Sequence, residues 1–158
     1  MISYQTSKKI LKKAIIKIKD EDIKSTNSLN RILSTNVYSN INYPSGDNAA
    51  FDGYAINSND TRKIKKNSPV NFEIIGSIAA GAKPFKKKIN KFETIEIMTG
   101  GIIPKGFDTI IPIEQIVFNS SKKYILINQK VKKYNHVRFA GSDYKKNELV
   151  VKKNTIIQ

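Results

Sequence analysis

The sequence contains no cysteine and no tryptophan, and its one histidine is His136. The lack of cysteine excludes a disulfide framework and thiolate metal sites, and a single histidine excludes a multi-histidine metal site. No apolar run approaches the roughly 20 residues that span a bilayer. The lysine-rich N-terminus also lacks the continuous apolar core and the small-residue cleavage site of a signal peptide. These absences predict a soluble, cytoplasmic protein without a membrane partner.

Acidic residues are few. The chain of 158 residues has 13 Asp and Glu against 28 Lys and Arg, which gives a net charge of +15. Such a charge can indicate a nucleic-acid partner. However, only three of the basic residues are Arg, and the lysines are scattered instead of gathering with aromatic residues into a stacking surface. The pattern therefore disfavours nucleic acid, and some of the charge can attract an anionic substrate.

Two helices are predicted near the N-terminus. Thr6 or Ser7 can cap the first, which should run to about Lys19. Its apolar stripe consists of Ile10, Leu11, Ala14, Ile15 and Ile18. A basic amphipathic helix can bind a membrane surface or a partner, but docking on a protein core is the favoured interpretation. Residues 25–28 offer caps for a second, short helix, with Leu29, Ile32 and Leu33 directed inward.

The rest of the chain predicts short strands at residues 70–78, 92–98, 110–117, 124–127, 137–139 and 148–151. Pro112 places the third of these at a sheet edge or a bulge. The predicted fold class is α+β, mostly β, with a short-stranded β unit inserted in a small α/β domain and preceded by a helix. We expect a helical segment at 1–21, a small domain from 22–44 plus 131–158, and a β domain at 45–130.

Residues 47–55, Asp-Asn-Ala-Ala-Phe-Asp-Gly-Tyr-Ala, contain an Asp-Gly pair. Such a pair tolerates positive φ and is typical of a tight turn. The turn would place Asp52 at a rim beside a buried aromatic residue, where its carboxylate could bind Mg²⁺ directly or through water. The alternative is a turn with a solvated aspartate.

Thr99, Gly100 and Gly101 follow the second predicted strand. Two glycines can turn successive N–H groups in one direction and form an anion-binding nest, to which the threonine hydroxyl adds a donor. The alternative is an ordinary strand-ending turn. Arg138 carries a guanidinium that suits phosphate or another oxyanion. Asp108 and Glu114 are further candidate site residues, with surface acids as the alternative.

Four segments, in this order, resemble the MoeA family, whose fold the E domain of gephyrin shares. They are residues 30–33 (Asn-Arg-Ile-Leu), 47–55, 96–111 with Glu114 at the close, and 137–143 (Val-Arg-Phe-Ala-Gly-Ser-Asp). The family patterns read Gly-Arg-Ile-Leu, Asp-Asn-Ser-Ala-Met-Asp-Gly-Tyr-Ala, Arg-Ile-Met-Thr-Gly-Ala-Pro and Ile-Arg-x-x-Gly-x-Asp. Four ordered matches over about a hundred residues form a specific signal.

The resemblance implies a multi-domain, dimeric molybdopterin molybdotransferase of molybdenum cofactor biosynthesis. Such an enzyme inserts molybdate into adenylylated molybdopterin with Mg²⁺ and releases AMP. The resemblance makes Asp52 and Thr99 catalytic, with Asp52 also a metal ligand. It makes the following residues substrate-binding: Gly100, Gly101, Arg138, Asp143, Asp108 and Glu114.

The chain departs from the family pattern at several positions. Ala49 and Phe51 replace Ser and Met, Glu96 replaces Arg, and Gly101-Ile102 replaces Ala-Pro. The resemblance also implies a larger pterin-binding domain, on which the first helix would pack and which is missing after Gln158. We therefore expect this chain alone to be incomplete and inactive. The alternatives are a non-catalytic binding or scaffold module and a degenerate, truncated copy.

Overall fold

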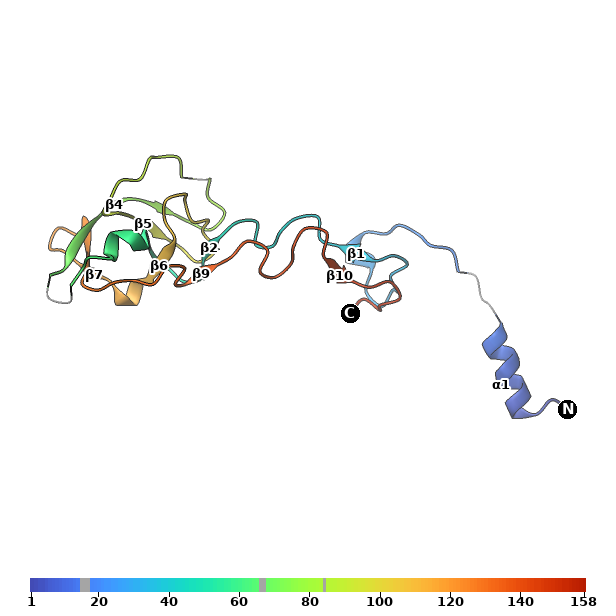
Figure 1. The fold of residues 1–158 in the computed structure, drawn as a ribbon. Coiled ribbons are helices and arrows are strands. Elements are labelled where there is room, and N and C mark those ends of the chain that lie inside the picture. Colours follow the sequence, from blue (N-terminus) through green and yellow to red (C-terminus); the bar gives the residue numbers. More distant parts are fainter. Residues whose placement is uncertain (15–17, 66–67, 84) are drawn as a thin grey trace. The chain divides into compact units, whose positions relative to one another are not determined.

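The computed structural model describes residues 1–14, 18–65, 68–83 and 85–158 (Figure 1). The chain divides into two compact units. Unit 1 comprises Met1–Val37 and Val151–Gln158, and unit 2 comprises Tyr38–Val150. The domain boundaries expected at residues 22, 45 and 131 stay a prediction. No helix among the described residues has the length and apolarity that crossing a membrane requires.

Helix α1 of unit 1 runs from Tyr4 to Lys13, and the Ser3 hydroxyl caps it by accepting the Thr6 N–H at 3.2 Å. The predicted extension to Lys19 is wrong, because Ala14 already has extended backbone and residues 18–19 are not helical. Residues 15–17, including Ile15 of the expected stripe, lie outside the described residues. None of the helical residues is buried. A helix this short gains little stability without packing, so nothing favours a longer one.

The second predicted helix, with Leu29, Ile32 and Leu33 inward, is also wrong. A single 3₁₀ turn, η1 (Ser25–Asn27), is followed by Asn30 at a φ of 62°, which ends helical geometry. Leu29 and Ile32 are exposed. Instead, Ile32 forms a β-bridge with Ile156, and the Leu33 N–H donates to the Thr155 carbonyl at 3.0 Å. Pairing with the distant C-terminal residues thus replaces the local helical hydrogen bonds.

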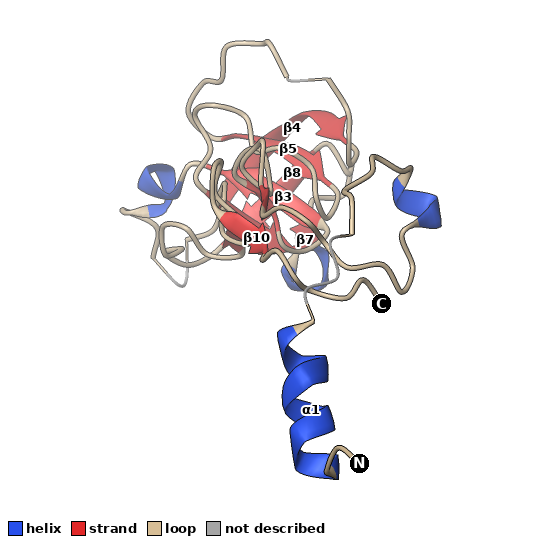
Figure 2. Cartoon of the chain, turned by 90° about the vertical axis from the view of Figure 1, so that its right-hand side faces the viewer, coloured by secondary structure: helices blue, strands red, loops and turns tan. Residues whose placement is uncertain are grey.

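Unit 2 is built on a six-stranded sheet with the order β6-β3-β5-β4-β8-β7 (Figures 1 and 2). The strands are β3 (Gly53–Ile56), β4 (Val70–Ile78), β5 (Glu93–Ile97), β6 (Thr109–Pro112), β7 (Val117–Phe118) and β8 (Tyr124–Ile127). Strands β4 and β5 are parallel, whereas the other neighbouring pairs are antiparallel. The ranges predicted for β4 and β8 are confirmed, and so is the mostly β, α+β fold class.

The smaller elements complete the fold. They are the pair β2 (Asn48–Ala49) with β9 (Val137–Arg138), the pair β1 (Val37–Tyr38) with β10 (Leu149–Val151), and the 3₁₀ turns η2 (Ser58–Thr61) and η3 (Ile113–Gln115). The predicted strand 110–117 is interrupted by η3 because β6 ends at Pro112, which has no N–H to continue the ladder. Strand β6 is an edge strand, as Pro112 predicted.

Two apolar clusters pack on opposite sides of the sheet, because successive strand residues point to opposite faces. One contains Ala49, Ala55, Ile78, Ile95, Ile97, Phe107 and Ile110. The other contains Tyr54, Ile56, Phe72, Ile111, Ile125 and Ile127. Strand β3 supplies residues to both clusters and lies between β5 and β6. It is therefore held on both faces and both edges.

Gly53 begins β3, and its φ is not positive, so the expected positive-φ turn at the Asp-Gly pair is wrong. The glycine is required for another reason. A Cβ built at this position would lie 2.0 Å from the carbonyl oxygen of Ile111 and 2.9 Å from its carbon. Only a residue without a side chain permits β6 to approach this closely.

We expect Gly53→Ala to lower the free energy of unfolding by on the order of 3 kcal/mol, because fixed backbone atoms of β6 must move. Denaturant melts of the purified chain measure this change. Gly46→Ala is the matched control, since its Cβ would meet only the flexible Ile102 side chain, at 3.3 Å. Its effect should stay within about 0.5 kcal/mol. Equal effects of the two substitutions would contradict the close-approach argument.

Candidate functional site

Backbone hydrogen bonds bring three of the motif segments together in unit 2. Asn48 of β2 pairs with Arg138 of β9. The Ala49 N–H donates to the Gly101 carbonyl at 3.0 Å, and the Gly100 N–H donates to the Ala49 carbonyl at 2.9 Å. Segment 47–55 therefore lies between the loop that follows β5 and the segment that contains β9. This convergence positions the side chains of the site.

Asp52 and Thr99 are in direct contact. The backbone N–H and the hydroxyl of Thr99 both donate to Asp52 Oδ1, each at 2.6 Å. These two bonds, the hydroxyl first, hold the pKa of Asp52 below its ordinary value, because they stabilise the charged carboxylate. Both residues are exposed. Asp52 thus presents an ionised, solvent-facing carboxylate at neutral pH. Of the two aromatic residues that flank the Asp-Gly pair, Tyr54 is buried, as expected for one of them, and Phe51 is half exposed.

The glycines after Thr99 form the ordinary strand-ending turn, not the open anion nest that the sequence also permitted. The N–H groups of Thr99, Gly100 and Gly101 donate to Asp52, Ala49 and Met98 respectively, all within the chain. Gly100 has a φ of 79°, which a glycine adopts without strain. These glycines support the turn that carries Thr99 to Asp52. Direct substrate binding by Gly100 and Gly101 stays a prediction.

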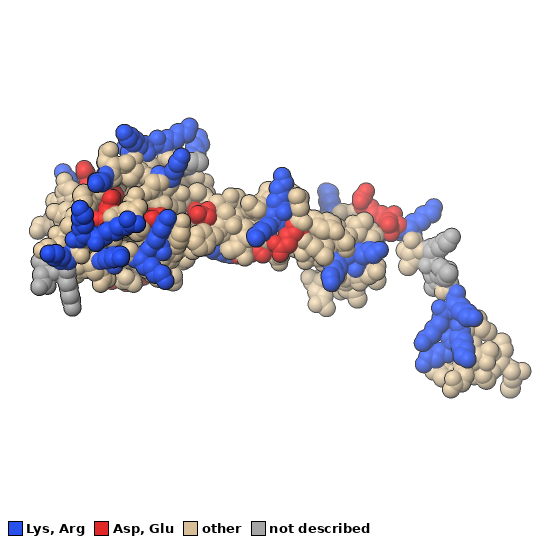
Figure 3. All heavy atoms as spheres, in the orientation of Figure 1, with Lys and Arg blue, Asp and Glu red and all other residues tan. Residues whose placement is uncertain are grey.

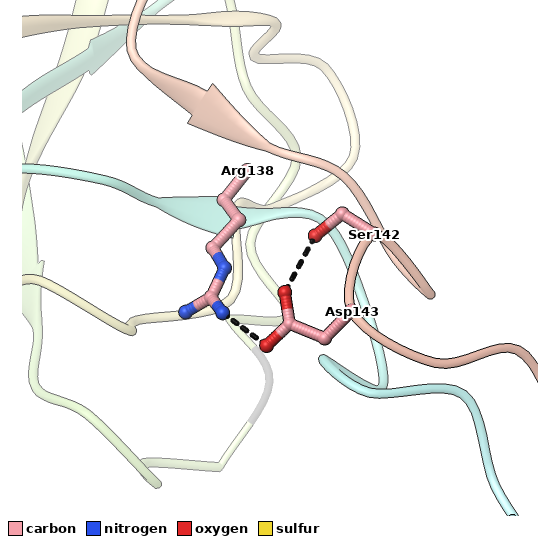
Figure 4. A network of polar contacts seen from close by, with 3 residues as sticks. All are labelled: Arg138, Ser142 and Asp143. Atoms are coloured by element: carbon pink, nitrogen blue, oxygen red, sulfur yellow. Dashed lines mark hydrogen bonds and ion pairs between the residues drawn. The ribbon is translucent and has the colours of Figure 1, made fainter. Parts of the chain in front are cut away.

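Arg138 is paired with Asp143 (Figure 4). The hydrogen bond and the charge of the guanidinium lower the pKa of Asp143, and the carboxylate raises the pKa of Arg138 in turn. Ser142 donates a further hydrogen bond to the Asp143 carboxylate at 3.3 Å. Both members of the pair are partly exposed. An incoming anion at Arg138 would compete with Asp143, so substrate binding by these two residues stays a prediction.

Asp108 and Glu114 do not join this group. Asp108 accepts from the Ser58 N–H at 2.8 Å with one oxygen and from the Ser58 hydroxyl at 2.9 Å with the other. Its carboxylate therefore fixes the start of η2. Glu114 lies exposed in η3. No hydrogen bond or ion pair within the described parts of the chain links either carboxylate to Asp52.

The structure adds residues that the sequence did not single out for the site. The Phe51 and His136 rings meet edge to face, with centroids 5.0 Å apart. Asn48 is buried, and its Oδ1 has no hydrogen-bond partner among the described residues. The contact of His136 with Phe51 depends on the pairing of β2 with β9, which no local sequence signal reveals.

Glu96 stands where the family pattern has arginine. It lies opposite Tyr54 in the β3–β5 ladder. Burial raises the pKa of the Tyr54 hydroxyl, and the Glu96 charge raises it further. The negative charge of Glu96, in place of the arginine of the family pattern, therefore acts on the face of the sheet that carries Tyr54.

Residues 2–158 match a family described as the MoeA N-terminal region, domains I and II. The chain belongs to this MoeA N-terminal family. It is 30% identical over 130 residues to the molybdopterin molybdenumtransferase of Bacillus subtilis, covering 81% of this chain and 30% of that protein. It is 31% identical over 147 residues to the Haemophilus influenzae protein of the same name, covering 93% of this chain and 35% of that protein.

A solved structure, the molybdopterin biosynthesis moeA protein of Pyrococcus horikoshii, is similar to this fold with a TM-score of 0.79 and 29% identity. The match covers 87% of this chain and 36% of that protein. The resemblance to MoeA is thus confirmed. The chain spans about a third of the length of these relatives, and it matches their N-terminal region.

We expect Thr99→Ala to raise the pKa of Asp52 toward its ordinary value, because the hydroxyl makes the larger of the two favourable contacts. Thr99→Ser keeps the hydroxyl and should keep the low pKa. Titration of the carboxyl carbon by NMR measures both variants. The stabilisation that the lowered pKa represents is present above the ordinary pKa and is lost as the pH falls through the lowered one. An unchanged pKa in Thr99→Ala would exclude the hydroxyl as a donor.

Proposed function

We propose that this chain forms the N-terminal part of a molybdopterin molybdenumtransferase, which inserts molybdate into adenylylated molybdopterin and releases AMP. The observation that carries the proposal is the exposed, ionised Asp52 carboxylate, which Thr99 holds in place within the region matched to the MoeA N-terminal family. The relatives that bear this activity in their names support it.

In the proposed reaction, Asp52 supplies negative charge at a fixed position. Thr99 orients the carboxylate through both of its donors, so one carboxylate oxygen is held and the group cannot rotate freely. Held geometry of this kind favours reaction because no reorientation is needed when substrate binds. Thr99 is therefore proposed to act on the reaction through Asp52 as well as by contact with substrate.

Asp52 fits an Mg²⁺ ion that would be shared between the protein, water and the substrate. This ion prefers carboxylate, water and phosphate oxygens and often takes only one or two carboxylates from a protein. Asp52 provides one such ligand, and no group of three His, Cys, Asp or Glu side chains gathers among the described residues. The remaining ligands would come from water, substrate or another domain. When bound, Mg²⁺ would neutralise charge on the anionic substrates.

The proposed enzyme needs more than this chain. Its relatives are about three times as long, and we propose that a pterin-binding domain and a homodimer complete the active site. One observation favours a second candidate, a non-catalytic member of the family used for binding or as a scaffold. Glu96 places a negative charge where the family pattern has a positive one, and this charge would repel anionic substrates nearby.

A chimera separates these two candidates. In it, the present chain replaces the corresponding N-terminal region of the Bacillus subtilis relative. We expect the folded chimera to release AMP from adenylylated molybdopterin in the presence of molybdate and Mg²⁺, and the chain alone to release none. Restoring arginine with Glu96→Arg tests the second candidate. If a folded chimera is inactive and Glu96→Arg activates it, the chain is a non-catalytic member.

We expect Asp52→Asn in the chimera to lower the rate of AMP release by at least about a hundredfold, because it removes the charge but keeps the size of the side chain. The denaturant midpoint of the isolated variant chain should stay close to that of the parent. Asp22→Asn, at an exposed position in unit 1, is the matched control and should leave the rate unchanged. A normal rate of AMP release in the Asp52→Asn chimera would show that the Asp52 carboxylate has no role in the reaction. Unfolding of the variant would make its role structural.

A further inference from the structure

A basic hollow opens in unit 2, apart from the Asp52 contact. Its volume is about 430 Å³, and it is lined by Ser58, Arg62, Lys130, Val131, Lys132 and Lys133. Four of these six residues are cationic, and none is acidic. Figure 3 shows lysine and arginine atoms spread over the visible face of the part that contains the six-stranded sheet, with fewer acidic atoms among them. Around this hollow the cations are concentrated, not merely scattered.

The backbone beneath the lysines is fixed by buried hydroxyl groups. The Thr61 hydroxyl accepts the Val131 N–H at 2.9 Å, and the Thr109 hydroxyl donates to the Lys132 carbonyl at 3.0 Å. Both threonines are fully buried. The loop is thus tied on either side of Val131, and Lys130, Lys132 and Lys133 project from a fixed backbone. Arg62 follows η2, whose last residue is Thr61, so the same hydroxyl ties the two sides of the hollow together.

Two carboxylates at η2, those of Asp60 and Asp108, form no ion pair with these cations within the described parts of the chain. Asp108 uses both oxygens on Ser58, and Asp60 accepts the Phe92 N–H at 3.1 Å. Among the described residues, the ion pairs involve Arg31 with Glu21 and Arg138 with Asp143, which lie outside the lining. Since Ser58 already donates both of its hydrogens to Asp108, a ligand in the hollow would meet cationic donors.

The hollow and Asp52 lie toward opposite ends of β3. Asp52 immediately precedes Gly53, the first residue of the strand, whereas Ser58 and Arg62 follow Ile56, its last residue. The strand itself spans about 10 Å at its usual rise per residue. The hollow is therefore a site separate from the one proposed for the transferase reaction, and the inference below does not rest on that reaction.

We propose that this hollow binds a small phosphate-bearing anion, of the oligophosphate class. Among the described residues, none of the four cations forms an ion pair, although the Lys133 ammonium lies over the Tyr134 ring at 4.6 Å from its centroid. Several cations on a tied backbone attract linked phosphate groups more strongly than a single charge does, and the Arg62 fork suits phosphate oxygens. The volume is that of a small-molecule site. The lining itself has no aromatic side chain for base stacking, and the ring of the neighbouring Tyr134 is already covered by the Lys133 ammonium. This arrangement disfavours single-stranded nucleic acid as the occupant.

Inorganic tripolyphosphate is the probe, titrated into the full chain by calorimetry. The test variant is Arg62→Gln with Lys132→Gln. The matched control is Lys86→Gln with Lys87→Gln, which removes the same charge from an exposed loop. We expect binding to weaken at least about tenfold in the test variant, since two charge-assisted contacts are lost, and less than about twofold in the control.

Thermal unfolding gives an independent measurement. Tripolyphosphate should raise the Tm of the parent and the control but not that of the test variant. Without the probe, the test variant should be at least as stable as the parent, because removing two of four neighbouring cations relieves repulsion. Inorganic phosphate should bind more weakly than tripolyphosphate.

Three outcomes overturn the proposal. One is the absence of tripolyphosphate binding to the parent at low salt. Another is an equal loss in the test and control variants, which would show a diffuse charge effect. The third is tighter binding of a single-stranded oligonucleotide that is lost in the test variant, which would make the hollow part of a nucleic-acid surface.

Discussion

The backbone of residues 48–56 is the constraint on which the rest of unit 2 depends. Its first part pairs with β9 and with the loop after β5, and its second part is β3, enclosed by β5 and β6. Gly53, at the junction, has no room for a side chain against Ile111. Since neither part can shift without breaking a ladder, Asp52 between them has a fixed place beside Thr99.

The Asp52–Thr99 contact shows how a charged group can be held without being buried. The two donors of one residue favour the ionised carboxylate, while exposure leaves it hydrated and open to a ligand. Arg138 and Asp143 are held differently, because the two side chains form an ion pair with each other. Unlike Arg138 and Asp143, Asp52 thus combines a defined position with a charge that no ion pair among the described residues compensates.

The lysines and arginines of this chain occur in two different environments. Runs such as Lys86–Lys88 lie in exposed loop, where solvent screens each charge. Around the basic hollow, buried threonine hydroxyls hold the loop that carries three of the cations. Composition alone cannot distinguish these cases, because it records how many charges exist and not which backbone atoms are tied.

Local pattern was sufficient where one residue type dominated a segment. The strand predicted from the β-branched residues of 70–78 has the same limits as β4. Pro112 correctly indicated an edge strand, because proline lacks an N–H. The ordered motifs also identified the family and marked Asp52 and Thr99 as candidate site residues, though not their contact. Local pattern failed at residues 29–33, where Asn30 adopts a positive φ and the backbone bonds to residues near the C-terminus.

The sequence by itself therefore determined the mostly β character, the edge position of β6 and the candidate carboxylate at Asp52. Only the tertiary structure decided that Thr99 contacts Asp52, that Arg138 is paired, that Asp108 binds Ser58 at the start of η2, and that three lysines line one hollow with Arg62. The physical reason is sequence separation. The Thr99–Asp52 contact and the bond from Val131 to Thr61 join residues 47 and 70 positions apart, and they depend on strand pairings that short-range periodicity does not encode. The Arg138–Asp143 pair spans only five positions and depends instead on the turn between the two residues.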